Sequence, residues 1–184
     1  MITVREAVSG DAGRLAEIYS HYVRNTAVSF EYEPPTAEEF AGRMKEITGR
    51  YPFFVVEKDG VVMGYAYARE LSKRAAYDYS SELTIYLLNG EQRQGMGRLL
   101  YERLEEALEK MGICNLYACI AYPETEDEYL TRNSAEFHKH LGFNDVGRFH
   151  NCGFKFGRWY HVVWMEKLIG KHNGTPELKK YSEI

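Results

Sequence analysis

Cysteine is scarce in this sequence, and its spacing argues against two familiar kinds of site. Only three cysteines occur among 184 residues, at positions 114, 119 and 152. Their number is odd and no CxxC pair is present, which disfavours both a disulfide framework and a zinc site. We therefore expect Cys114, Cys119 and Cys152 to be buried free thiols in a reducing cytoplasm, and we expect no metal.

Long apolar runs and an excess of basic charge are also missing. No stretch of about 18 apolar residues exists, so no membrane-spanning helix is predicted. The first residues lack the charged and apolar regions of a signal peptide. With 23 basic and 27 acidic residues and a net charge of −4, the chain does not have the profile of a nucleic-acid-binding protein. These features favour a cytoplasmic globular protein that binds neither nucleic acid nor membranes.

The length predicts one domain, which we assign to residues 1–169, followed by a polar tail at 170–184. Alternating apolar and polar residues predict strands, and apolar residues at helical spacing predict helices. The expected strands are 2–7, two runs within 52–70 around an Asp59-Gly60 turn, 79–88, 115–122, 143–154 and 159–168. The expected helices follow Ser9–Asp11, run from the capping box at Thr36 to Ile47, run from the glycine turn to Gly112, and span 134–140.

This order of elements, β-α-α-β-β-β-α-β-α-β-β, predicts the fold class. Three consecutive strands favour antiparallel pairing, whereas the strand-helix-strand unit in the middle requires a parallel neighbour. The expected fold is α/β in the broad sense, with one mixed sheet and helices on its faces.

The turn before the longest helix, "EQRQGMGRLL" (91–100), has two glycines two residues apart. A helix start leaves backbone N–H groups without partners, and the helix dipole adds positive charge there, so such a turn can bind a phosphate. Glycine permits a positive φ and a close approach of the ligand. The Q-x-x-G-x-G spacing matches neither a dinucleotide-binding motif nor a P-loop. From these residues alone, the alternative stays open that the glycines serve only to form the turn and bind no phosphate.

Placed between a strand and a long helix, this motif resembles the acetyl-CoA loop of the GNAT family of N-acetyltransferases. Within that family, three stretches resemble the phosphinothricin and methionine sulfoximine or sulfone N-acetyltransferases: "HYVRNTAVSFEYEP" (21–34), "RAAYDYSSELTIYL" (74–87) and "GFKFGRWYHVVWM" (153–165). The resemblance extends from Ile2 to about Leu168. It implies a mostly antiparallel sheet with one splayed parallel strand pair, acetyl-CoA as the acetyl donor, a small amine acceptor and a homodimer.

The resemblance also implies which residues contact the cofactor. Backbone groups of Ile85, Tyr86 and Leu87 would bind the pantetheine arm as an added strand. The diphosphate would lie against the turn formed by Gln92, Arg93, Gln94, Gly95, Met96, Gly97 and Arg98. Relatives have a shorter loop in place of 123–130 and an asparagine at the start of the next helix. Here that column holds Thr131, and Asn133 follows two residues later; either could cap the helix.

Acetyl transfer to an amine requires a base and a proton for the departing thiolate. The resemblance assigns the base to Glu82, although strand alternation alone favours a solvated carboxylate. Within a cleft, burial would raise the pKa of such a group toward a useful value. The resemblance places His138 where many relatives have the tyrosine that protonates the thiolate, and histidine suits this role near neutral pH. An ordinary surface histidine, like the neighbouring His140, is the alternative.

For the acceptor, the resemblance points to Phe30, Arg74 and Tyr77. Arg74 could bind a carboxylate through two parallel hydrogen bonds, which would suit an amino acid or an analogue, or it could be a solvated loop residue. Ser72 stands where phosphinothricin acetyltransferases have lysine, so that substrate is not implied directly. Two other functions stay open, namely a non-catalytic acyl-CoA-binding regulatory module and a peptide or protein N-acetyltransferase.

Overall fold

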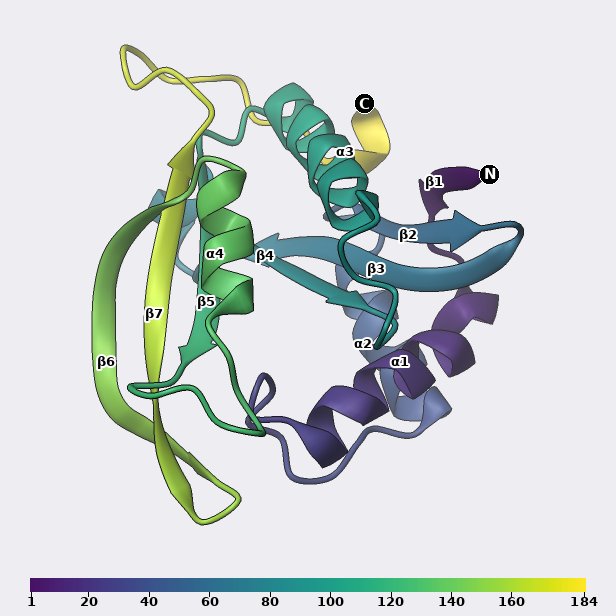
Figure 1. The fold of residues 1–184 in the computed structure, drawn as a ribbon. Coiled ribbons are helices and arrows are strands. Elements are labelled where there is room, and N and C mark those ends of the chain that lie inside the picture. Colours follow the sequence, from purple (N-terminus) through teal and green to yellow (C-terminus); the bar gives the residue numbers. More distant parts are fainter.

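The computed structural model describes residues 1–184 and has seven strands in one mixed sheet with helices on both faces (Figure 1). The strand order is β1-β2-β3-β4-β5-β7-β6, and β4–β5 is the one parallel pair. The predicted fold class and element order are confirmed. The strands are β1 (Ile2–Glu6), β2 (Phe53–Lys58), β3 (Val61–Glu70), β4 (Ser80–Leu87), β5 (Asn115–Tyr122), β6 (Asn144–Lys155) and β7 (Arg158–Leu168); the helices are α1 (Ala12–Asn25), α2 (Ala37–Ile47), α3 (Met96–Met111) and α4 (Asn133–His140).

Local signals in the sequence set several of these boundaries. At the β2–β3 turn, Asp59 and Gly60 have φ values of 53° and 81°, as a two-residue type I′ hairpin requires. The hydroxyl of Thr36 accepts a hydrogen bond from the Glu39 N–H, and the Glu39 carboxylate accepts one from the Thr36 N–H. The predicted capping box at the start of α2 is therefore confirmed.

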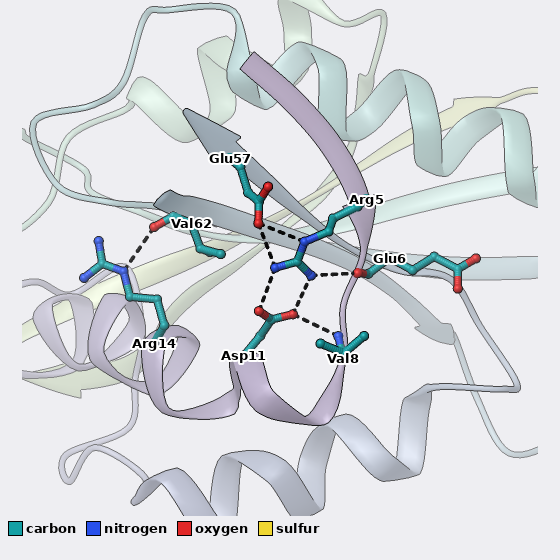
Figure 2. A network of polar contacts seen from close by, with 7 residues as sticks. All are labelled: Arg5, Glu6, Val8, Asp11, Arg14, Glu57 and Val62. Atoms are coloured by element: carbon teal, nitrogen blue, oxygen red, sulfur yellow. Dashed lines mark hydrogen bonds and ion pairs between the residues drawn. The ribbon is translucent and has the colours of Figure 1, made fainter. Parts of the chain in front are cut away.

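The sequence Ser9–Asp11 suggests a side-chain cap at the start of α1, but in the structure this start is fixed by an ion-pair network. Asp11 precedes the helix, yet its carboxylate caps no helical N–H. It instead accepts two hydrogen bonds of 2.8 Å from Arg5 of β1 and one from the Val8 N–H, while Arg5 also binds Glu57 of β2 (Figure 2). The Arg5 guanidinium lowers the pKa of Asp11. This network connects the first two strands to the helix that follows them.

Two apolar cores lie on opposite faces of the sheet. One packs α3 and α4 against the sheet and includes Phe54, Leu100, Leu104 and Leu116; the other packs α1 and α2 and includes Phe53. Neighbouring β2 residues alternate between the two cores, as strand geometry requires. The buried face of α3 is formed by the positions around Leu100 and Leu104, while Leu99 lies beside it and is 40% exposed.

The parallel pairing of β4 and β5 is short. Ser80–Glu82 pair with Asn115–Tyr117, after which β4 continues through Leu87 with only β3 as its partner. Figure 1 shows the two strands diverging beyond this point. The splayed strand pair predicted from the family resemblance is therefore present, and the β5-facing edge of β4 is left unpaired from Leu83 onward.

The polar C-terminal segment returns to the domain. The Lys179 N–H donates to the Met111 carbonyl at the end of α3, and the Tyr181 ring packs edge-on against Phe54. The Tyr181 hydroxyl donates to Glu6. None of the helices combines the length and apolar composition needed to cross a membrane.

Candidate active site

A cavity of about 1350 Å³ lies where β4 and β5 diverge. Its walls come from β3, β4 and β5 together with α1, α2, α3 and α4, and from the loop that follows α1. Ile85 and Tyr86 of β4 and Ile120 and Ala121 of β5 are among the residues that line it. The splay therefore opens a space large enough for two substrates to meet between two strands.

The glycine turn precedes α3 as the sequence predicts. Gly95 is the N-cap residue with φ 82° and provides no side-chain cap, so the N–H groups of Met96, Gly97 and Arg98 have no intrahelical acceptor. A Cβ at Gly97 would lie 3.0 Å from the Phe137 ring of α4. Gly97 thus keeps α3 and α4 close together beside the open N–H groups.

Side chains around the turn hold its shape. The Gln92 side-chain oxygen accepts from the Gly90 N–H, and Lys58 donates to both Glu91 and Gln94. Arg93 and Arg98 are exposed and form no ion pair. Three free N–H groups and two unpaired arginines fit a diphosphate, so the turn can hold the diphosphate of coenzyme A.

Glu82 lies at the end of the paired part of β4 and lines the cavity. Its side chain is 12% exposed, and one carboxylate oxygen accepts a 2.8 Å hydrogen bond from Arg69 of β3. The second oxygen has no hydrogen-bond partner within the protein, and it is free to accept a proton from a ligand.

His138 is a buried residue rather than a surface histidine. Its Nδ1 lies 2.7 Å from the Ser134 carbonyl and its Nε2 lies 2.8 Å from the Tyr101 hydroxyl. A carbonyl only accepts, so Nδ1 carries the proton and Nε2 accepts from Tyr101. Burial lowers the pKa of His138 to about 4. At neutral pH the ring is uncharged, and it orients the Tyr101 hydroxyl.

Tyr101 is a site residue that the sequence analysis missed. It lies on α3, lines the same cavity as Glu82 and His138, and burial raises its pKa. In the sequence it occupies a position on the apolar face of a helix, where an aromatic residue usually belongs to the core. Its hydroxyl becomes significant only when α4 places an acceptor beside it.

The predicted cofactor residues on α4 lie differently. Arg132 occupies the N-cap position of α4 and its side chain caps no N–H, but the Thr131 hydroxyl accepts a 3.4 Å hydrogen bond from the N–H of Asn133, the first residue of the helix. A side-chain bond to the helix start is therefore present at Thr131, whereas Asn133 lies inside the helix and does not cap it. Asn133 is exposed and does not line the cavity, whereas Ser134 does.

On the acceptor side, the structure brings only one of the three predicted residues to the cavity. Phe30 lines it. Arg74 precedes a short 3-10 turn and Tyr77 is its last residue; both are exposed and lie outside the cavity lining.

The sequence analysis also missed the cations that do line the cavity. Arg43 forms an ion pair with Glu31, Arg50 with Glu70, and Arg69 with Glu82. Lys73, adjacent to Arg74, has no acidic partner. Lys73 is therefore the unpaired cation among the residues that line the cavity.

The cysteines depart from expectation. All three are free and Cys114 is buried as predicted, but Cys119 and Cys152 are exposed. Cys119 belongs to the cavity wall on β5, where the divergence of β4 removes the neighbour that would have covered it. No group of three or more His, Cys, Asp or Glu side chains is arranged to hold a metal ion.

Comparison with known proteins gives a consistent result. The family model for the acetyltransferase (GNAT) domain matches residues 4–164. A phosphinothricin N-acetyltransferase of Streptomyces viridochromogenes is 32% identical, over 90% of this chain and 87% of its own length. An L-methionine sulfoximine/L-methionine sulfone acetyltransferase of Salmonella typhimurium is 28% identical, over 93% and 96%.

Among solved structures, a phosphinothricin acetyltransferase from Sinorhizobium meliloti in complex with AcCoA superposes with a TM-score of 0.88 at 32% identity, covering 98% of this chain and 95% of that one. The match of the family model covers most of the chain, and the splayed strands and glycine turn lie within it. The chain therefore belongs to the acetyltransferase (GNAT) family.

Proposed function

We propose that this acetyl-CoA-dependent N-acetyltransferase acetylates the primary amine of a small amino-acid-like molecule. Relatives at about 30% identity carry the names of phosphinothricin and methionine sulfoximine or sulfone acetyltransferases. The observation that carries the proposal is the position of Glu82, with one carboxylate oxygen held by Arg69 and the other free in the cavity.

In this proposal Glu82 is the general base. An amino group is mostly protonated at neutral pH, because its pKa is about 8 or higher. Glu82 accepts that proton, directly or through one water, so that the nitrogen lone pair becomes available. Arg69 fixes the orientation of the carboxylate.

Acetyl-CoA supplies the activated acetyl group as a thioester. The open N–H groups of Met96, Gly97 and Arg98 bind its diphosphate, and the unpaired edge of β4 at Ile85, Tyr86 and Leu87 binds its pantetheine arm. We assign the hydrogen bond to the departing sulfur to Tyr101, whose single hydroxyl hydrogen is released by His138 Nε2 and turns toward the sulfur as the thiolate forms. This assignment moves the thiolate role predicted for His138 to Tyr101, which His138 holds in position before the reaction.

The acceptor binds between Phe30 and the loop that carries Lys73. We assign its carboxylate or other anionic group to Lys73, because this cation lines the cavity without an acidic partner. A neighbouring role for Arg74 stays a prediction from the family resemblance.

A screen of amines tests the proposal. Free-thiol release from acetyl-CoA is followed with amino acids, phosphinothricin, methionine sulfoximine, methionine sulfone and polyamines. We expect acceptor-dependent release with carboxylate-bearing amines. A protein that binds acetyl-CoA but releases no thiol with any amine would instead be a regulatory acyl-CoA-binding module. Release only with peptides would favour a protein N-acetyltransferase.

We also propose a homodimer in the cytoplasm. Apolar side chains are exposed along β6 and β7, including Val146, Phe149 and Trp159, which are 54%, 60% and 63% exposed. A second copy would cover them. Light scattering should give twice the monomer mass for the protein and a monomer for Trp159→Lys. The three free thiols suit a reducing compartment.

A further inference from the structure

Lys155, at the end of β6, is a buried cation whose hydrogen bonds all go to the end of α1 and the loop that follows it. Its ammonium donates to the carbonyls of Val23, Thr26 and Ser29 at 2.7, 2.8 and 2.7 Å, and the residue is 3% exposed. A lysine has three N–H donors, so these bonds satisfy it completely. The carbonyls lie at and beyond the C-terminal end of α1, where the helix dipole favours a cation. No carboxylate forms an ion pair with Lys155.

The segment that Lys155 holds, residues 26–31, forms one wall of the cavity. Val28, Ser29, Phe30 and Glu31 all line it. We call this segment the acceptor loop. Its Ala27 N–H donates to the Tyr129 carbonyl, its Ser29 and Glu31 side chains bond to Tyr19, and Glu31 also accepts two hydrogen bonds from Arg43. Lys155 adds bonds to two backbone carbonyls of the loop, and to Val23 just before it, from a strand that is more than a hundred residues away in the sequence.

The same end of β6 also limits where Phe30 can lie. A Cβ at Gly153 would lie 2.1 Å from the Phe30 ring, so the absence of a side chain there leaves room for the ring. The Tyr32 hydroxyl donates to the Phe154 carbonyl just beyond it. Residues 153–155 therefore set both the backbone and the aromatic side chain of the acceptor loop.

We propose that Lys155 is a positioning residue that holds the acceptor loop in the conformation that binds the amine. The inference rests on the proposed function, since it assigns the loop to the acceptor. Without the ammonium, three buried carbonyls lose their donors and must move toward water, which displaces Ser29 and Phe30. The glycine turn is outside the cavity lining and the edge of β4 is on another wall, so we expect both to keep their geometry.

Lys155→Met tests this proposal by keeping the chain length and removing the three donors. With the best amine from the wild-type screen, we expect the KM for the acceptor to rise about tenfold, because unpaired buried carbonyls destabilise the binding conformation. The Kd for acetyl-CoA, measured by calorimetry, stays unchanged. A variant that loses kcat and acetyl-CoA binding in proportion to its folded fraction, with an unchanged acceptor KM, would overturn the proposal. Lys45→Met, on the exposed side of α2, is the matched control and should leave both constants unchanged.

Two further measurements keep the proposal testable if Lys155→Met folds poorly. Gly153→Ala pushes the Phe30 ring without touching the ammonium, and it should also raise the acceptor KM while leaving the Kd for acetyl-CoA unchanged. Hydrogen exchange needs no acceptor: in Lys155→Met the amides of residues 26–31 should exchange faster, whereas those of 85–87 should not. Unchanged exchange at 26–31 contradicts the inference, while failure of every amine in the wild-type screen contradicts only the proposed function.

Discussion

The two ends of the candidate active site are built from different parts of the chain. At the start of α3, the proposed diphosphate site consists of backbone N–H groups within three consecutive residues, Met96, Gly97 and Arg98. At the centre, the groups that would perform the chemistry are side chains from separate elements: Glu82 on β4 with Arg69 on β3, and Tyr101 on α3 with His138 on α4. Cofactor binding thus depends on local chain geometry, whereas catalysis depends on how distant elements pack.

The sharpest way to separate the two ends is Glu82→Gln. Removing the base should lower kcat by about 10³-fold, within the range that general base catalysis contributes, while the Kd for acetyl-CoA stays the same. Glu46→Gln is the matched control, because Glu46 also lines the cavity without an ion pair. If Glu82→Gln retained wild-type kcat across the pH range, Glu82 would not be the base.

Acid should lower the stability of the end that is built from side chains, because it protonates His138. Its pKa is lowered to about 4 in the folded protein from an ordinary value near 6.5, so the unfolded chain binds the proton more readily between these pH values. Stability contributed by the neutral ring is therefore present above pH 6.5 and is lost as the pH falls toward 4, about 3 kcal/mol in all. Urea unfolding at several pH values measures it.

The control for this prediction is His138→Gln, which cannot titrate. The difference in unfolding free energy between wild type and variant should shrink by roughly that amount from pH 7 to pH 4. A difference that is independent of pH would mean that the His138 ring is not held neutral by burial.

The backbone end should respond to Gly97→Val without effect on the acceptor. The added side chain meets the Phe137 ring, 3.0 Å from the position of its Cβ, and separates α3 from α4. We expect the Kd for acetyl-CoA to rise about tenfold, as for an overpacked site, with little change in the acceptor KM. Gly42→Ala has open space around its Cβ and should bind normally. An equal rise in the Kd for acetyl-CoA and in the acceptor KM would show that the two ends are not independent.

The smallest expected effect separates two adjacent cations. Lys73 lines the cavity and Arg74 does not, so Lys73→Ala should raise the acceptor KM up to about fivefold, as for an exposed ion pair. Arg74→Ala should leave it unchanged. The opposite result would support the binding of the acceptor's carboxylate by Arg74, as expected from the family resemblance.

This contrast also explains what the sequence could predict. The hairpin at Asp59-Gly60, the capping box at Thr36 and the glycine turn are encoded by neighbouring residues, and the structure has each of them. The element order then implied the mixed sheet and its parallel pair, because crossover rules leave few alternatives.

Contacts between distant elements could not be obtained in this way. In the sequence Tyr101 is only a residue on the apolar face of a helix, because its hydroxyl gains a role when α4 brings His138 Nε2 to 2.8 Å. Arg69 is likewise only a strand arginine in the sequence, because it reaches Glu82 when β3 pairs with β4. Cys119 lies within an apolar strand sequence typical of the core, yet it is exposed where the strands diverge. Lys155 contacts carbonyls some 130 positions earlier in the chain. In each case tertiary packing, not local pattern, decides the role.

The most direct test of the central claim is a titration with acetyl-CoA followed by backbone amide NMR. If the open N–H groups at the start of α3 bind the diphosphate, the amides of Met96, Gly97 and Arg98 should show the largest downfield shifts, and pantetheine without the diphosphate should leave them in place. Binding of acetyl-CoA that leaves these three amides unshifted would contradict the account.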